Sequence, residues 1–443
     1  MHEALKQFYS PRQSIVVAAY SAIAALIIYL VPVPTLAGVL IIAISLGIIA
    51  TIGFHNRSLF TPLVVAFIAR LSIALVYTAI PELDPDPDGY GIRAVEWAVN
   101  GLSGTFEHFT TGAYLYSWLI SLLYATTGES EFTVRAVNVL LGVLVVWCTY
   151  ILAFELWNSK RIALRAAWLT AIFPNLIRFS ASFPSREALI ILSLIIAITL
   201  FVRWIKREKF QFILGSMVFF VISISLHTGM LVGLFVVGLI VIITACRDLL
   251  RHRLRSMTRG VAATLVVVLS LGLIWISGWG LEKVGEELTL SGGIEQLRSL
   301  GEESAIGRAA YLQDARADSM TDVIRILPLR IGYFMFAPTI WMAKTPLDLL
   351  GVIDGLFYVV LVWCLFRSRK YIWGNILARN ILFIVLVIVT IFAMATSNYG
   401  TAIRHRAKVA PVLISLLVLS PLSRHRRIDF KSDGVSDGNN TEG

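Results

Sequence analysis

The chain has 443 residues, of which 57% are hydrophobic and only 15% are charged, and its mean hydropathy is +0.78. A water-soluble domain needs far more polar surface, so the composition excludes a soluble globular protein. The net charge of +10 does not indicate nucleic-acid binding in such a chain, because lysine and arginine gather in the cytoplasmic loops of membrane proteins.

Apolar runs of about 18–20 residues recur along most of the chain, and each can cross a hydrocarbon layer of roughly 30 Å. The runs are continuous rather than alternating, which favours helices over membrane strands. We therefore predict an all-α, polytopic transmembrane helical bundle with about 12 spans. The predicted spans are 14–31, 37–54, 60–80, 134–156, 162–180, 186–204, 211–226, 228–246, 260–280, 349–366, 379–396 and 407–422.

The distribution of basic residues predicts one orientation for these spans. With the N-terminus inside, basic clusters such as 203–209 and 247–259 fall on the cytoplasmic side, as the positive-inside rule requires. The two longest loops, 81–133 and 281–348, then fall on the outer side. We take residues 1–423 as one transmembrane domain in the cell membrane and 424–443 as a disordered cytoplasmic tail.

Two apolar segments are predicted to stay on the outer side without crossing the membrane. Ile324–Met342 contains Arg325, Arg330 and two prolines, which suits an interfacial or re-entrant element. Ala113–Ala125 is too short to span. Its aromatic residues predict a helix in the headgroup layer, where such rings prefer to lie.

The three cysteines are Cys148, Cys246 and Cys364. All of them lie in or beside apolar runs, and none has the spacing of a metal ligand. We interpret them as small packing residues.

An acidic segment, Glu82–Tyr90, follows the third predicted span. Its residues Asp84, Asp86 and Asp88 alternate with prolines, and proline excludes a helix here. A carboxylate at a membrane boundary, near other carboxylates, can have a raised pKa and act as a general base. The alternative is a solvated loop that only follows the charge asymmetry.

The order of motifs after this segment resembles the first outer loop of GT-C-fold glycosyltransferases. These motifs are Tyr90-Gly-Ile-Arg-Ala94, the Tyr-rich helix, Gly128-Glu-Ser-Glu131 with Arg135-Ala-Val-Asn138, Phe173-Pro174-Asn175 and Ser185-Arg186-Glu187. The superfamily includes the protein O-mannosyltransferases and the lipid A aminoarabinose transferases. The likeness covers roughly residues 60–230.

The resemblance implies an inverting transfer from a polyprenyl-phosphate-linked sugar to a glycan, lipid or protein acceptor, with no cofactor. It also implies that an aspartate in the first outer loop is the base. Family members usually have Asp-Glu four and three residues before the tyrosine, whereas this chain has Asp86 and Pro87, with Asp88 next. We favour Asp86, with Asp88 as the close alternative. The Asp-x-Asp spacing is also compatible with a divalent cation.

A second cluster, Asn398–Lys408, is the strongly basic segment predicted on the outer side. Its Arg404 and Arg406 are candidate ligands of the donor phosphate, because guanidinium groups bind phosphate oxygens through two parallel hydrogen bonds. Neutralising a departing phosphate is the main catalytic assistance that such a reaction needs. The alternative role is contact with lipid headgroups.

Further candidates for substrate binding lie at the predicted outer boundary. A charged pair at the end of a span suggests either a ligand or an internal ion pair, and a histidine in a short turn is either a cavity residue or a cap. These candidates are Asp84, Tyr90, Tyr114, Tyr116, Arg178, Arg186, Glu187, His227 and Tyr399.

Two other functions share part of this pattern. An O-antigen or exopolysaccharide polymerase or ligase also uses polyprenyl-linked substrates, but it would tolerate Asp86→Asn and Asp88→Asn. A secondary transporter would have ionisable residues in the middle of its spans and two similar halves. Few such residues are present, Arg70 and Glu155 being the nearest cases.

Overall fold

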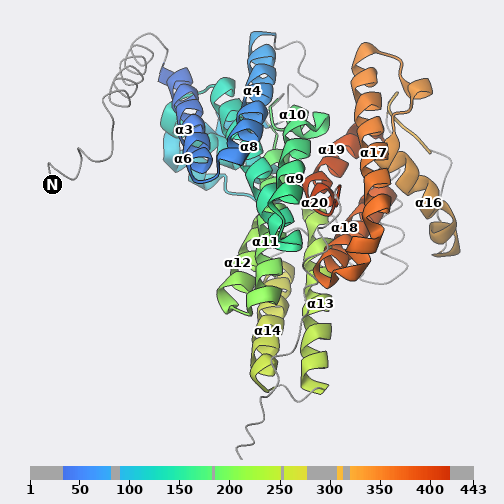
Figure 1. Cartoon of the computed structure of the whole chain (residues 1–443). Helices are drawn as coiled ribbons and strands as arrows, with labels where there is room; N and C mark the ends of the chain where they lie inside the picture. Colours follow the sequence, from blue (N-terminus) through green and yellow to red (C-terminus); the bar gives the residue numbers. More distant parts are fainter. Residues whose placement is uncertain are drawn as a thin grey trace, which may run out of the picture.

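The computed structural model describes residues 33–80, 90–181, 185–250, 254–276, 307–312 and 320–419. This part of the chain forms α-helices joined by short turns (Figure 1), and its extended pairing is limited to one bridge between Ala310 and Asn398. The predicted all-α bundle is therefore confirmed. The predicted first span, 14–31, and the predicted tail, 424–443, lie outside the described residues.

Seven of the described helices are long and apolar enough to cross a membrane, which makes the chain a multi-pass membrane protein. They are α3 (Val33–His55), α4 (Arg57–Ala79), α8 (Glu131–Trp157), α11 (Glu187–Arg207), α13 (Leu231–Leu250), α17 (Pro346–Gly374) and α18 (Ile376–Ala395). Two further helices with shorter apolar stretches, α12 (Phe210–Leu226) and α14 (Leu254–Ile276), extend the bundle.

Polar residues at the helix ends define several of these boundaries. The Ser130 hydroxyl accepts a hydrogen bond from the Thr133 N–H at 3.3 Å and starts α8. Asn158 ends α8 in the left-handed region, with a φ of 47°, a conformation that asparagine tolerates better than most residues. The Asn375 side chain accepts hydrogen bonds from the first turn of α18. Such caps satisfy backbone groups that the helix itself leaves unpaired.

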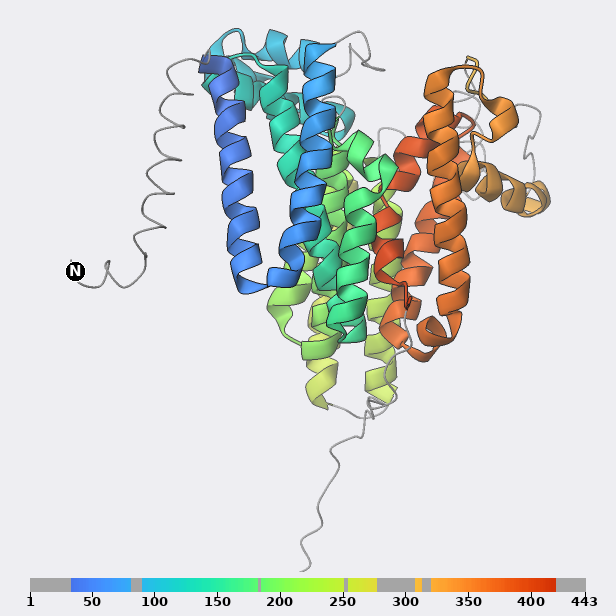
Figure 2. The same ribbon diagram turned by 45° about the horizontal axis from the view of Figure 1, so that its top comes forward.

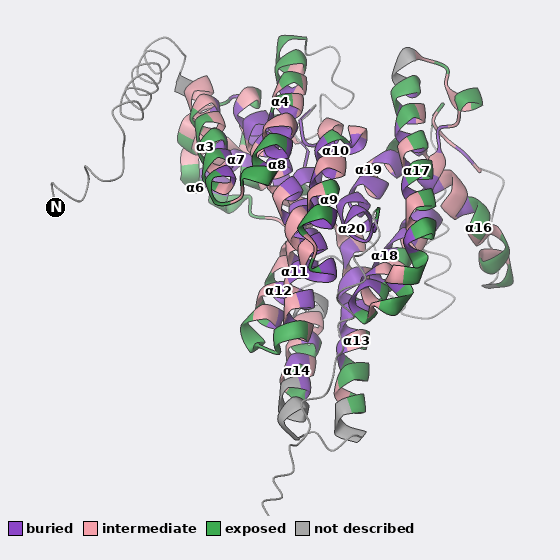
Figure 3. Cartoon of the chain, in the orientation of Figure 1, coloured by how far each residue is buried: buried purple, intermediate pink, exposed green. Residues whose placement is uncertain are grey.

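The buried core lies where α8 packs against α4, α9 (Lys160–Ile172) and α11, and where α11 packs against α12. Figure 3 shows buried residues gathered along these central helices, whereas α3 and α17 are exposed over much of their surface. The predicted span 162–180 is interrupted at Pro174, which opens the short helix α10 (Pro174–Phe179). Proline is favoured at the first position of a helix because a backbone N–H there would have no acceptor within the helix.

The segment after residue 90 forms α5 (Gly91–Ala98), α6 (Gly101–Glu107), η2 (Gly112–Tyr114) and α7 (Leu115–Thr127). The prediction for Ala113–Ala125 is partly wrong, because Tyr116 and Tyr124 of α7 are buried in the protein core. Exposed apolar side chains lie instead just before this helix, at Val99, Phe106 and Phe109. Sequence spacing alone does not separate an aromatic that faces lipid from one that faces protein.

The helix α16 (Met320–Phe336), followed by η4 (Ile340–Met342), occupies the segment predicted not to cross. It is not among the helices long and apolar enough to span, which agrees with the prediction. Figure 2 shows α16 lying across the direction of α17 rather than alongside it.

The predicted last span, 407–422, does not form one helix over its described part. The chain forms α19 (Tyr399–Ala407) and α20 (Ala410–Ser415), and residues 417–419 are not helical. Nearly every side chain from 406 to 418 is buried by protein, so the hydropathy of this segment reflects packing in the bundle. In Figure 1, α19 and α20 lie between α9–α11 and α17–α18.

We call the end of the bundle that bears α5–α7 and residues 307–312 the loop end. The short η3 helix (Thr228–Met230) and the N-terminus of α11 face this end, and the basic C-terminus of α11 lies at the opposite end. The three cysteines are free thiols.

Candidate active site

The acidic residues Asp84, Asp86 and Asp88 lie outside the described residues, which resume at Tyr90. The Tyr90 ring meets the Tyr116 ring edge to face, with their centroids 5.4 Å apart. The guanidinium carbon of Arg186 lies 5.7 Å from the centroid of the Tyr90 ring, within the range of a cation–π contact. The chain that leaves the acidic segment therefore lies against the N-terminus of α11.

Tyr116 connects this contact to the turn before α11. Its hydroxyl donates to Asn138 Oδ1 at 3.0 Å, and Asn138 Nδ2 donates to the Ser185 carbonyl at 3.1 Å. Burial raises the pKa of Tyr116, so the phenol stays protonated and keeps donating. The chain of hydrogen bonds fixes the turn that presents Arg186 and Glu187.

Glu187 is the first residue of α11 and only 1% exposed. A carboxylate at a helix N-terminus is favoured by the helix dipole. Arg404 Nε lies 3.2 Å from Glu187 Oε1, and the Arg404 side chain is 26% exposed. Glu187 Oε2 has no hydrogen-bond partner among the described residues. One buried acceptor is therefore available to a ligand, since buried polar atoms are normally hydrogen-bonded.

Arg186 stands beside this carboxylate on the same turn. Its Nη1 donates to the Leu226 carbonyl oxygen at the end of α12. Its Nε is buried and finds no acceptor within the described part of the chain. An unsatisfied acceptor at Glu187 and an unsatisfied donor at Arg186 thus lie on adjacent residues.

Two histidines and a lysine extend the site. The rings of His227, just before η3, and His405 of α19 have centroids 4.9 Å apart. His405 also stacks on Phe392 at 4.7 Å, and its Nδ1 lies 2.6 Å from Lys408 Nζ. Lys408 is fully buried, and burial lowers its pKa well below the usual value, while the charge of Glu187 opposes that shift. We call Arg186, Glu187, His227, Arg404, His405 and Lys408 the Glu187 cluster.

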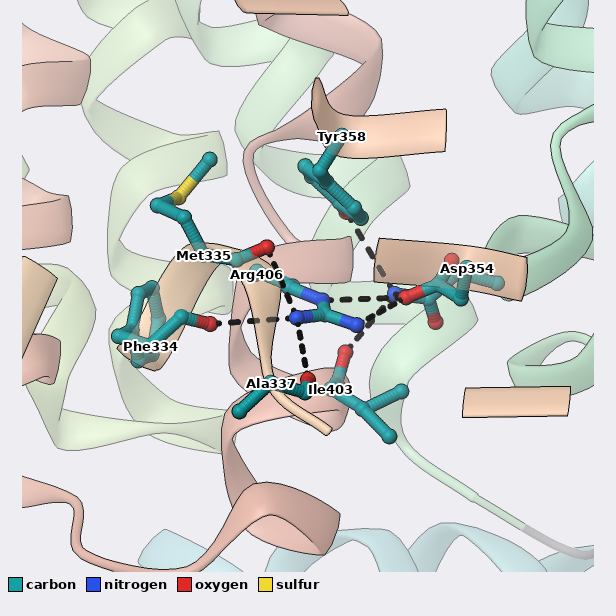
Figure 4. A network of polar contacts seen from close by, with 8 residues as sticks. Phe334, Met335, Ala337, Asp354, Tyr358, Ile403 and Arg406 are labelled. Atoms are coloured by element: carbon teal, nitrogen blue, oxygen red, sulfur yellow. Dashed lines mark hydrogen bonds and ion pairs between the residues drawn. The ribbon is translucent and has the colours of Figure 1, made fainter. Parts of the chain in front are cut away.

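Arg406 does not lie in the Glu187 cluster. Its Nε and Nη2 donate to Asp354 Oδ2 at 3.0 and 2.6 Å. Its Nη1 donates to the carbonyl oxygens of Phe334, Met335 and Ala337 (Figure 4). These carbonyls end α16, where helix acceptors lack partners. The prediction that Arg406 binds a phosphate is therefore replaced by a structural role, because its side chain is fully buried and held by protein groups.

Arg178, Tyr399 and Tyr114 also lie apart from the Glu187 cluster. Arg178 belongs to α10 and acts electrostatically on the buried Asp354. The Tyr399 hydroxyl donates to Asp348 Oδ1 at 3.0 Å. Tyr114 is 48% exposed, and the guanidinium carbon of Arg93 lies 3.8 Å from its ring centroid. For Tyr399 and Tyr114 these contacts favour structural or surface roles, whereas Arg178 stays a candidate for substrate binding.

A second group of contacts fastens the segment 307–312 onto the start of α19. The Tyr311 N–H donates to the Ser397 carbonyl at 2.8 Å, and the Tyr399 N–H donates to the Ala309 carbonyl at 3.0 Å. Arg308 Nη1 reaches Asp348 Oδ2 at 2.6 Å. The helix that bears Arg404 and Lys408 is thus held on one side by the second long loop.

The structure brings predicted site residues into contact: Tyr90 meets Tyr116 and Arg186. Glu187 pairs with Arg404, and His227 meets His405 beside it in the chain. Sequence reasoning missed Lys408 and His405, although both belong to the basic segment that it singled out. For Lys408 the available signal was its spacing from Arg404, because residues four apart on a helix share a face, and His405 lies three residues before Lys408. No group of three histidine, cysteine or acidic side chains within the described residues could hold a metal ion.

The sequence profile of the dolichyl-phosphate-mannose-protein mannosyltransferase family matches residues 112–275. The match begins at η2 and ends in α14, and it includes Glu187 and His227 but not α19. No curated protein matches the chain.

Proposed function

Because the matched region supports a place in the GT-C superfamily of membrane glycosyltransferases, we propose that the protein transfers a sugar from a polyprenyl-phosphate carrier to an acceptor hydroxyl. Asp86 or Asp88 is the general base, and Arg404 with Arg186 holds the phosphate. One observation carries this proposal. The last residue of the acidic segment, Tyr90, contacts Arg186 at the Glu187 cluster.

Covalent geometry limits how far the base can lie from this cluster. Asp88 is two residues from Tyr90, and two residues of chain reach at most about 7 Å whatever their conformation. Asp86 is four residues away, a reach of about 14 Å. Either carboxylate is therefore within reach of an acceptor bound beside Arg186. The acceptor hydroxyl would give its proton to this carboxylate as it attacks the sugar.

The positive charges of the Glu187 cluster suit the phosphate that leaves the sugar. Arg186 and Arg404 both act electrostatically on the Glu187 carboxylate, so two guanidinium groups gather at one place in the cluster. The bond from the sugar C1 to the phosphate oxygen breaks, and the phosphate gains one negative charge. Cations placed there stabilise the transition state more than the bound donor, and this difference is what lowers the barrier.

Attack from the side opposite the phosphate would invert the configuration at C1. Two buried groups have no hydrogen-bond partner in the described residues, the donor Arg186 Nε and the acceptor Glu187 Oε2. The donor suits a phosphate oxygen, and the acceptor suits a sugar hydroxyl. The loop end would face outside the cell, because the basic ends of α11 and α13 then face the cytoplasm.

The test is a transfer or hydrolysis assay with purified protein in liposomes and polyprenyl-phosphate mannose as probe. Asp86→Asn and Asp88→Asn are compared with Glu107→Gln, an exposed acidic residue of α6. One of the two aspartate variants should lose about 10²- to 10⁴-fold in rate, as expected for a lost general base. Full turnover in both, with Glu107→Gln also active, would refute the assignment of the base.

A further inference from the structure

Lys408 is a buried amine with an incomplete set of partners. Its Nζ can form three hydrogen bonds as an ammonium, and the partner found for it is His405 Nδ1 at 2.6 Å. Within the described residues no carboxylate forms a salt bridge with it, since Glu187 Oε1 pairs with Arg404 instead. Burying an ammonium group without an anionic partner costs several kcal/mol. We therefore expect the Lys408 amine to be neutral until an anionic ligand binds beside it.

The position of the His405 ring allows proton exchange with the Lys408 amine. Its ring is held by Phe392 on one face, with centroids 4.7 Å apart. The His227 ring meets it at 4.9 Å in an edge-to-face contact. These contacts orient Nδ1 toward Lys408, while the side chain as a whole is only partly buried. The imidazole thus lies between the buried amine and the less buried side of the cluster.

Building on the proposed function, we propose that Lys408 and His405 form a proton-transfer pair that protonates the lipid phosphate as it leaves the sugar. The donor is a phosphodiester with one negative charge, and the product is a phosphate monoester that has two charges until it is protonated. Lys408 would be a catalytic residue that touches this phosphate. His405 would be a positioning and relay residue that acts through Lys408.

The transfer moves two protons and one sugar. The acceptor oxygen bonds to C1, and the acceptor proton moves to the carboxylate of Asp86 or Asp88. The C1–O bond to the phosphate breaks, and its electron pair stays on the phosphate oxygen. The ammonium of Lys408 gives one proton to the phosphate and becomes a neutral amine. His405 then returns a proton taken from solvent to Lys408, while the aspartate releases its proton to solvent.

The charged and titratable groups around Lys408 come from three elements. Glu187 and Arg186 at the start of α11 and Arg404 on α19 act on it electrostatically. His405 on α19 contacts its Nζ, and His227 before η3 packs against His405. The helix α18 presents the uncharged ring of Phe392, whose centroid lies 5.4 Å from Nζ. Desolvation and the two arginines favour the neutral amine, and Glu187 favours the ammonium. A bound phosphate dianion would shift the balance further toward the ammonium.

We expect the protein to take up a proton when the phosphate product binds. Purified protein is titrated calorimetrically with a short-chain polyprenyl phosphate in two buffers of different ionisation enthalpy at about pH 9, where histidine is neutral. Wild-type protein should take up about one proton for each phosphate bound, as linkage requires when a group gains a proton in the complex. Uptake should fall toward zero as the pH drops through the lowered pKa of Lys408.

Two variants at position 408 remove this uptake in different ways. Lys408→Arg remains charged and Lys408→Met remains neutral, so neither should take up a proton on binding. Lys408→Met also suits a buried site, which guards against an unfolded variant. The matched control is Lys344→Arg, an exposed lysine whose contact with Asp348 is through its backbone N–H; it should behave as wild type.

His405→Asn tests the relay. Its side-chain oxygen retains an acceptor for Lys408 but cannot pass on a proton. The first turnover should keep its rate, while steady-state turnover should fall at least ten-fold because Lys408 regains its proton slowly. Uptake that persists in Lys408→Met, or wild-type binding without uptake between about pH 6 and 10, would overturn the proposal. Failure of wild-type protein to bind the phosphate at all would instead overturn the proposed function.

Discussion

Replacing Arg404 and Arg406 separately should give opposite results, although the two lie only two residues apart. Arg406 is fully buried and pairs with Asp354 at 2.6 Å, whereas the Arg404 side chain is 26% exposed. Arg406→Gln leaves Asp354 as an uncompensated buried charge, which costs about 3–5 kcal/mol. It also releases three carbonyl oxygens at the end of α16, each worth about 1 kcal/mol. We therefore expect a loss of at least about 4 kcal/mol in the free energy of unfolding.

Arg404→Gln should cost much less stability, about 1 kcal/mol, because its ion pair with Glu187 is partly solvated and Arg186 remains beside that carboxylate. Its transfer rate should fall by about 10²- to 10³-fold, the usual effect of removing one group that stabilises developing charge. Unfolding is measured by denaturant titration in detergent, and the rate by transfer from polyprenyl-phosphate mannose in liposomes. Arg165→Gln, at an exposed site on α9, is the control.

A double-mutant cycle tests whether Arg406 stabilises the protein through its ion pair with Asp354. Asp354→Asn should destabilise the protein about as much as Arg406→Gln, and the two together should be far less than additive, because both remove the same ion pair. If Arg406→Gln kept wild-type stability but lost binding of the donor, the structural role assigned to Arg406 would be refuted, and the role predicted from the sequence would be restored.

Three further substitutions test other parts of the structure. Gly142→Ala should lower stability, because its Cβ would lie 2.5 Å from Arg70 Nε, whereas Gly47→Ala, with no atom within 4 Å, should be neutral or stabilising; thermal unfolding in detergent compares them. Gly229→Ala should lower the transfer rate more than the melting temperature, because its Cβ would lie 2.5 Å from the Phe392 ring that supports His405. Glu155→Gln leaves Arg203, Lys206 and Arg207 without their shared carboxylate and should cost about 1–2 kcal/mol, a loss that shrinks at high salt as the three cations are screened.

The membrane bundle could be predicted from the sequence because hydropathy and polar caps act locally. The long apolar runs near α3, α4, α8, α11 and α13 predicted helices close to those in the structure. The same hydropathy was misleading for the predicted span 407–422, because its apolar side chains from Ala407 to Val418 are buried by protein. A run of apolar residues indicates that a segment is buried away from water, but it does not indicate whether lipid or protein surrounds the segment.

The site could be predicted only in part, for a geometric reason. Residues two apart on a helix point about 200° away from each other, so Arg404 and Arg406 face different neighbours. Which of them meets a ligand depends on where Asp354 and the end of α16 lie, and those partners are about 50 and 70 residues away in the chain. Lys408 shares a face with Arg404, yet its burial follows from the packing of α11 and α18 around it.

In the proposed function, the position of α19 gives one short helix both a structural and a chemical role. Arg406 fixes it to the end of α16, and the backbone contacts of Tyr399 and Tyr311 fix its start to residues 307–312. The opposite face presents Arg404 and Lys408 to Glu187. A phosphate site needs cations that do not relax when the ligand leaves, because preorganised charge costs no reorganisation during the reaction. The buried ion pair of Arg406 therefore supports α19 and holds its Arg404 side in register with α11.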